Sequence, residues 1–282
     1  MTGTSIAIAP TANRRRSRSL LIGGLLTGFI ALIALISLVY LPYAPADTTG
    51  GRLAAPDLAH WAGTDKLGRD LLTQLMIGAR IALLAGGGSV LIGAILGISL
   101  GLAAAFATRW IDDTVAAVLD ILIAFPTLLL AMLVIAAQGA SLGSAVLAIG
   151  LGMSAIVARL TRILAKRVLT QDYITAARTS GTSWPSIIGR HVLPNIWPTI
   201  LVNLALQFGL AVLAEASLSY LGLGAPPPNA SWGRILQEAQ GTVYTAPIGA
   251  VLPGLLLVVL VIGVNLAADG LRDVADPTRR TR

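Results

Sequence analysis

The hydrophobic positions of this chain fall into long runs that contain no charged residue. About 20 apolar residues make one helical crossing of a bilayer. The run over residues 121–158 is too long for one crossing and divides near residues 138–141, so the pattern predicts six transmembrane helices. They lie within residues 20–41, 81–108, the two parts of 121–158, 192–214 and 239–268, the last beginning near Pro247.

The composition agrees with a membrane protein. Hydrophobic residues make up 55% of the chain and charged residues only 12%, against roughly 25% charged in a soluble domain. These values exclude a soluble globular enzyme, a disordered chain and a coiled coil. The chain has no cysteine, which excludes disulfides and thiolate metal sites. We therefore expect an all-α integral membrane protein of the plasma membrane.

The basic residues indicate the orientation. With the N-terminus inside, 15 of the 20 lysines and arginines lie in inner segments, as in cytoplasmic loops generally. We expect both termini in the cytoplasm, lipid around the helices and no nucleic-acid partner. The first apolar run has 22 residues, which exceeds the roughly 7–15 residues of the apolar region of a cleaved signal peptide. We therefore expect this run to be a transmembrane helix. The expected segments are a basic tail (1–19), the first transmembrane helix (20–41), an extracytoplasmic loop (42–80), a core transmembrane domain (81–270) that includes a long cytoplasmic loop (159–197), and a C-terminal tail (271–282).

The chain carries no recognisable catalytic or cofactor motif. It has no phosphate-binding loop, because the glycine-rich residues 86–89 lack the lysine. The two histidines, His60 and His191, are expected on opposite sides of the membrane, which excludes a metal pair. Asp120 and Asp269 are expected at helix ends, and Glu215 is the acidic residue inside a span. An ion-coupled carrier would show more charged residues in its spans, so we expect neither catalysis nor a cofactor in this chain.

The inner loop between the fourth and fifth spans is too patterned for a simple connector. A short helix is expected from Asp172, which favours a helix N-terminus, to Gly181, which ends it. Residues 182–183 can cap a second short helix with Pro185 in its first turn, and Pro194 is expected to break the chain before the fifth span.

One face of that first short helix is unusual for a membrane surface. It combines one aromatic ring with small side chains, whereas surface helices carry larger apolar residues. We therefore favour docking into a groove of another protein over lying on lipid headgroups. The face consists of Tyr173, Ala176, Ala177 and Ser180.

This loop resembles the EAA loop of ABC importer permeases. The family pattern is Glu-Ala-Ala-x3-Gly-x9-Ile-x-Leu-Pro, and the chain has Thr175 in place of the glutamate and His191 in place of the isoleucine. The other positions match in type and spacing. The resemblance implies that the loop contacts the ATPase subunits through Tyr173, Thr175, Ala176, Ala177, Gly181, Leu193 and Pro194.

Further stretches are similar to the OppC/DppC branch of these permeases. Residues 215–224, 226–228 and 231–233 resemble its segment around the fifth span, and residues 265–273 with 276–277 resemble its C-terminal end. Eighteen of the 20 basic residues are arginine, which is compatible with a GC-rich actinobacterium. The outer-loop motif of the branch is represented by Gly63, Thr64, Asp65, Gly68, Arg69 and Asp70.

The resemblance implies the type I fold of ABC importer permeases and a role as half of a translocation path. A sister permease of the DppB/OppB kind, two ATPase domains that bind ATP and Mg²⁺, and an extracytoplasmic substrate-binding protein are the implied partners. The implied substrate is a di- or oligopeptide, with nickel, glutathione or haem as alternatives within the family. A stand-alone secondary transporter or channel is the alternative of another class, and inverted repeats would favour it.

Three structural expectations complete the sequence picture. Residues 64–78 can form an amphipathic helix, either a lid at the outer mouth or a headgroup anchor, with ion pairs between residues 65 and 69 and between 66 and 70. Glu215 contacts a peptide amino group or, as we favour, pairs with an arginine such as Arg80. A stripe of small residues in the second span permits close helix approach, within the subunit rather than with a second permease. The stripe is Ala85, Ser89, Gly93, Gly97, Gly101 and Ala105.

Overall fold

The computed structural model describes residues 12–275, and its described part is helical apart from loops and one isolated β-bridge. The N-terminal tail before residue 12 and the C-terminal tail after residue 275 lie outside the described residues, as do residues 276–277 of the C-terminal motif. The helices are α1 (Ala12–Val39), α2 (Leu71–Phe106), α3 (Arg109–Ala124), α4 (Thr127–Gln138), α5 (Leu142–Leu169), α6 (Asp172–Thr179), α7 (Trp184–Ile187), α8 (Leu193–Tyr220), α9 (Trp232–Ala239) and α10 (Ile248–Ala275).

Five of these helices, or segments containing them, are long and apolar enough to cross a membrane. The predicted number of six is reached when α3 and α4 count as one span, bent by 88°. The prediction of a single third helix from residue 121 was therefore wrong. Pro126 lies at the bend, where its ring and missing N–H interrupt helical hydrogen bonding. The predicted division near residues 138–141 is present, because Gly139 ends α4 with a φ of +86°.

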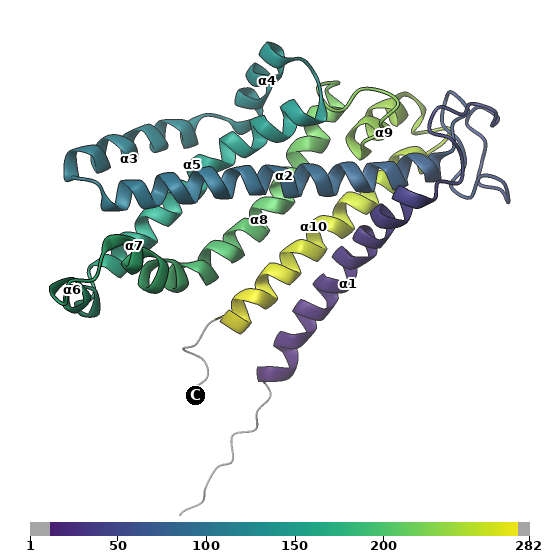
Figure 1. Ribbon diagram of the computed structural model, residues 1–282. Coiled ribbons are helices and arrows are strands. Elements are labelled where there is room, and N and C mark those ends of the chain that lie inside the picture. Colours follow the sequence, from purple (N-terminus) through teal and green to yellow (C-terminus); the bar gives the residue numbers. More distant parts are fainter. Residues whose placement is uncertain (1–11, 276–282) are drawn as a thin grey trace, which may run out of the picture.

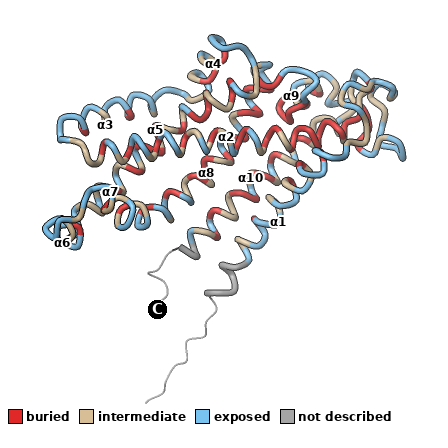
Figure 2. Tube along the Cα trace, in the orientation of Figure 1, coloured by how far each residue is buried: buried red, intermediate tan, exposed pale blue. Residues whose placement is uncertain are grey.

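The long helices place the short ones at two opposite ends of the molecule (Figure 1). The loop of residues 40–70 and α9 lie at one end, and α6 and α7 lie at the other. The N-terminal end of α1 and the C-terminal end of α10 lie side by side, away from the loop of residues 40–70. Buried residues concentrate on α2, α5 and α8, whereas α1 and α3 are largely exposed (Figure 2).

The small-residue stripe of α2 is packed within the subunit, against α5. A β-carbon added at Gly97 would lie 2.6 Å from the β-carbon of Val157, and one added at Gly101 would lie 2.5 Å from the carbonyl oxygen of Ala158. At Gly93 the distance to the β-carbon of Met153 would be 3.1 Å. The two helix backbones therefore approach more closely than any side chain would permit.

Three predicted boundaries were wrong. Helix α2 begins at Leu71 rather than residue 81, so a separate amphipathic helix over 64–78 does not form. Helix α5 continues to Leu169, so the loop expected to begin at residue 159 begins after that helix. The helical path from Trp184 runs through a π-helical turn, Ile188–Val192, into α8, so Pro194 lies in the first turn of α8 and does not break the chain.

Candidate functional site

Helices α6 and α7 form a short helical pair that is anchored by two buried isoleucines. Ile174 of α6 and Ile187 of α7 are 2% and 0% exposed and pack in one cluster with apolar residues of α2, α5 and α8. Gly181 connects the two helices with a φ of +83°, a backbone conformation that favours glycine. The short helices are therefore held firmly against the long helices that cross the membrane.

Most of the surface of α6 outside this anchor is open. Thr175 and Ala176 are exposed and Tyr173 is 45% exposed, whereas Ala177, about 60° around the helix from Ile174, is half-buried. The structure places Tyr173, Ala176 and Ala177 on one side of α6, and Thr175 lies about 160° around the helix from Ala177. Leu193 and Pro194 lie apart from α6, in the first turn of α8.

Three aromatic contacts that the sequence analysis missed join the two short helices to each other, to α2 and to the π-helical turn. The guanidinium of Arg178 lies 4.1 Å from the ring centroid of Trp184, a cation–π contact. The same Trp184 ring packs edge-on against Phe106 at the end of α2, with 5.0 Å between centroids. Tyr173 also lies near His191, with 5.9 Å between ring centroids. No spacing in the sequence signals these contacts, because they join four separate elements.

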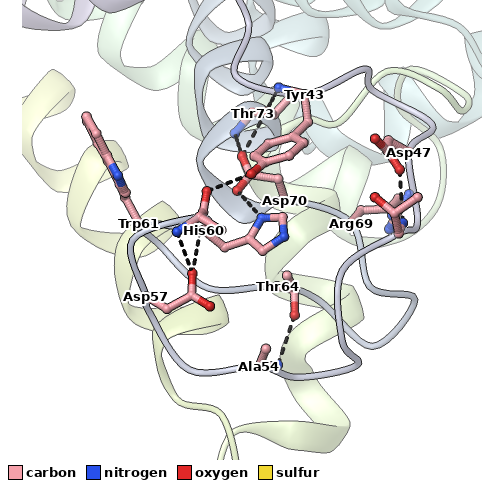
Figure 3. Close-up of polar contacts among 12 residues, drawn as sticks. Tyr43, Asp47, Ala54, Asp57, His60, Trp61, Thr64, Arg69, Asp70 and Thr73 are labelled. Atoms are coloured by element: carbon pink, nitrogen blue, oxygen red, sulfur yellow. Dashed lines mark hydrogen bonds and ion pairs between the residues drawn. The ribbon is translucent and has the colours of Figure 1, made fainter.

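At the other end of the molecule, Asp70 organises the outer loop (Figure 3). It caps α2 by accepting hydrogen bonds from the backbone N–H and the hydroxyl of Thr73, at 2.7 and 2.8 Å. Its other carboxylate oxygen lies 3.0 Å from Nδ1 of His60, whose ring stacks on Tyr43. The expected ion pair between Lys66 and Asp70 is not formed, because both carboxylate oxygens have these other partners.

A second ion-pair network joins the outer loop to α9. Arg69 binds Asp65 at 2.6 Å, as expected, and also Glu238 of α9 at 2.5 Å. Gly63 and Gly68 turn the loop with φ values of +78° and +85°. The outer loop is thus a folded structure fixed to α9, rather than a helix.

Two further contacts shape the same loop. Thr64 forms a β-bridge with Asp70, and its hydroxyl accepts from the backbone N–H of Ala54 at 2.9 Å and donates to the carbonyl of Gly51. Hydrogen bonds from Thr49 hold the pKa of Asp47 below its usual value. These contacts order the loop without help from a second chain.

Glu215 has a different partner from the one expected. Its carboxylate is 2% exposed within α8 and accepts a hydrogen bond of 2.5 Å from the hydroxyl of Ser219. Among the described residues no arginine lies within ion-pair distance of it, so the favoured pair with Arg80 was wrong for the subunit by itself. Trp232 packs nearby and donates from Nε1 to the carbonyl oxygen of Leu75 at 3.0 Å.

Helices α3 and α5 are joined by two kinds of charge contact. Asp112 is 4% exposed and binds Arg162 through two hydrogen bonds, of 2.5 and 2.9 Å, and Lys166 through a third. Asp120 binds Arg159 at 3.1 Å, with both side chains more than half exposed. Asp120 lies within α3 and not at a helix end as expected, because α3 runs from Arg109 to Ala124.

The charged and imidazole side chains do not gather into a metal site within residues 12–275 as described. The polar contacts described above are ion pairs, helix caps and loop hydrogen bonds, whereas Thr27, Thr161 and Asn203 each bury a side-chain oxygen without a hydrogen-bond partner. The structure thus has a short helical pair, α6 and α7, at one end of the helical bundle and a folded loop at the other. The ion pairs of α3 and α5 lie between them.

Comparison with known proteins assigns the class. The family described as the inner membrane component of binding-protein-dependent transport systems matches residues 93–281. The chain therefore belongs to this family of transport permeases. The prediction of a permease subunit of an ABC importer is confirmed.

Individual relatives extend over most of the chain. The dipeptide transport system permease protein DppC of Alkalihalophilus pseudofirmus is 35% identical over 268 residues, which cover 95% of this chain and 88% of that protein. A putative peptide transport system permease protein of Brucella suis is 39% identical, with coverages of 98% and 93%. The glutathione transport system permease protein GsiD of Pectobacterium atrosepticum is 41% identical over 224 residues, with coverages of 79% and 74%.

A solved structure shows the same fold. A chain of the methionine ABC transporter MetNI, in inward-facing conformations, superimposes with a TM-score of 0.62 and 22% identity. The match covers 74% of this chain and all of that one. The predicted fold, an all-helical ABC importer permease, is confirmed.

Proposed function

We propose that this chain is one of two permease subunits of an ATP-driven importer of di- or oligopeptides. It forms half of the path across the plasma membrane, and separate ATPase subunits bind ATP and Mg²⁺. The names of two similar permeases, which transport a dipeptide and a peptide, support this substrate class. Glutathione is a second candidate, supported by the name of a third relative and by its own peptide chemistry.

The end of the molecule that carries α6 faces the cytoplasm in this proposal, and both termini lie on that side. The support is the distribution of basic residues, since 15 of 20 fall in the segments assigned to the inside. Arg162 and Lys166 belong to the last two turns of α5, which directly precede α6 in the chain. The opposite end, with the ordered outer loop, then faces the substrate-binding protein.

The observation that carries the proposal is the open face of α6. A helix anchored by one buried isoleucine, with small residues beside an exposed tyrosine on a neighbouring side, is suited to a groove in another protein. Its anchor shares a cluster with α5 and α8, so a push on α6 moves two membrane helices. An ATPase that closes beneath this face therefore changes the tilt of the spans.

A long charged side chain on this face tests the proposal. Ala177→Arg places a guanidinium where the small face needs close contact, so we expect loss of ATPase co-purification and of dipeptide uptake. Thr179→Arg is the matched control, because Thr179 is exposed on the same helix and lies about 160° away from Ala177 at 100° per residue. The control adds the same charge and is expected to assemble normally.

The outcomes separate the candidate functions. Normal ATPase assembly and uptake in Ala177→Arg would contradict the coupling role of α6. Dipeptide uptake by the purified chain without any ATPase would show that the chain is a secondary transporter and not an importer subunit. Uptake of glutathione, nickel or haem by the intact complex, with no uptake of dipeptides, would support the ATP-driven importer and contradict the dipeptide substrate.

A further inference from the structure

Asp120 and Arg159 form an ion pair that this subunit leaves open to its surroundings. The carboxylate of Asp120 lies 3.1 Å from Nη1 of Arg159, and the side chains are 58% and 51% exposed. The neighbouring pair of Asp112 and Arg162, by contrast, is 5% and 17% exposed and closes the contact between α3 and α5. The packing of these helices therefore does not require a second, open ion pair.

The position of the pair makes contact with lipid unfavourable. Asp120 lies eleven residues into α3, about 16 Å along its axis, and Arg159 lies about 25 Å from the outer end of α5. Charged side chains at such positions in membrane proteins face the bundle interior or a water-filled cavity. The face that carries this pair is thus directed toward water or toward protein.

The break between α3 and α4 is a second observation, close to Asp120 along the chain. The span bends by 88° at Phe125 and Pro126, little more than one helical turn beyond Asp120. Non-helical backbone inside a membrane is tolerated where it is buried in protein or lines a water-filled cavity. Phe125 is 56% exposed, so this subunit does not bury the break.

We propose that this face of α3 and α5 lines the translocation path and that Asp120 and Arg159 bind the charged termini of the passing peptide. The inference rests on the proposed function for the identity of the solute. A zwitterionic peptide carries an ammonium and a carboxylate, which complement the carboxylate of Asp120 and the guanidinium of Arg159. Without a peptide the two side chains neutralise each other, so the empty path contains no isolated charge.

Cysteine accessibility tests the location of the face. The chain has no native cysteine, so each introduced thiol is unique within it. Ala117→Cys places a thiol one turn from Asp120 on the same side of α3, and Val118→Cys places one about 160° around the helix from Asp120. Both positions are exposed in the subunit, which makes Val118→Cys a matched control.

The labelling is done on the transporter assembled with its partners in lipid nanodiscs, with a charged thiosulfonate that does not enter lipid. We expect the thiol at position 117 to react at least tenfold faster than the thiol at 118, and a dipeptide to slow its reaction during ATP turnover. Equal rates would overturn the proposal. Labelling of position 117 by a lipid-soluble maleimide alone would also overturn it, because the face would then contact lipid. Labelling by neither reagent would overturn it as well, because the face would then be buried against the sister permease.

Substitution of the acid tests the contact with the peptide. Asp120→Asn removes one charge-assisted hydrogen bond, so we expect the KM for dipeptide uptake to rise about tenfold. Asp113→Asn is the control for the position along the path, because Asp113 is a 66% exposed carboxylate on the same side of α3 but two turns nearer the helix start, where it pairs with Arg109 and not with Arg159. An unchanged KM in Asp120→Asn would overturn the binding role.

The two hypotheses fail in distinguishable ways. If the wild-type complex imports no dipeptide, the proposed substrate is wrong, while the labelling contrast between positions 117 and 118 still decides whether the face lines a path. If the complex imports dipeptides and the contrast is absent, the proposed function stands and this inference is wrong.

Discussion

Replacing Gly97 by alanine is a direct test of the close contact between α2 and α5. The added β-carbon would lie 2.6 Å from the β-carbon of Val157 and 2.8 Å from the carbonyl oxygen of Ser154. Neither atom belongs to the flexible end of a side chain. Because non-bonded carbon atoms prefer about 3.5–4.0 Å, α2 and α5 must separate locally by roughly 1 Å.

The expected cost follows from this geometry. Overpacking of a close-packed interior costs about 1–3 kcal/mol, and the separation also weakens the contacts of Gly93 and Gly101 with α5. Alanine is a better helix former than glycine by about 1 kcal/mol, which offsets part of the cost. Compared with a glycine-to-alanine substitution at an unobstructed position, we expect Gly97→Ala to lower the free energy of unfolding by about 2 kcal/mol. The gain in helix propensity is the same in both variants, so it cancels in this comparison.

Gly87 supplies the unobstructed comparison. It lies on the same helix, and a β-carbon added there has no neighbouring atom within 4 Å. Thermal unfolding of the purified chain in detergent, followed by the fluorescence of its five tryptophans, compares Gly97→Ala with Gly87→Ala. At the scaling of domains of 150–250 residues, 2 kcal/mol lowers the midpoint by about 4–8 °C.

An equal or higher midpoint for Gly97→Ala than for Gly87→Ala would refute the reasoning. It would mean that the α2–α5 spacing adapts to an additional methyl group at no cost. The stripe would then need another explanation, such as contact with the sister permease.

Two further substitutions test contacts at other positions. Arg162→Met leaves the buried carboxylate of Asp112 with Lys166 as its remaining partner. We therefore expect the free energy of unfolding to fall by about 3 kcal/mol in the same thermal assay. An unchanged midpoint would show that Lys166 alone stabilises the carboxylate. Trp232→Phe keeps a ring in the core but removes the hydrogen bond to the carbonyl of Leu75, so we expect α9 to be destabilised by about 1 kcal/mol and to exchange its amide hydrogens faster. Unaltered exchange in α9 would count against that anchoring role.

The elements that sequence patterns predicted correctly are those fixed by local chemistry. Gly139 ends α4, Gly181 ends the α6 turn, and α10 begins directly after Pro247. Each of these residues has a backbone preference that acts independently of its neighbours. The α6 face of Tyr173, Ala176, Ala177 and Ser180 follows from helical spacing, and its role in docking stays a prediction.

The boundaries that were wrong depend on partners far away in the chain. Residues 159–169 look like a basic loop, but they continue α5 because acidic residues of α3 neutralise Arg159, Arg162 and Lys166. Residues 64–70 have helical charge spacing, but Arg69 binds Glu238 of α9 and Asp70 caps α2. Charge spacing along one segment does not reveal these contacts.

Hydrophobic run lengths and local motifs were sufficient to predict a helical membrane protein and its family, because both are properties of contiguous residues. The break in the third span, the bond between Glu215 and Ser219, and the exposed pair of Asp120 and Arg159 became evident only from the packing of the helices. Those features depend on which helices pack side by side, and helices that contact each other in space can be separated by many residues in the chain.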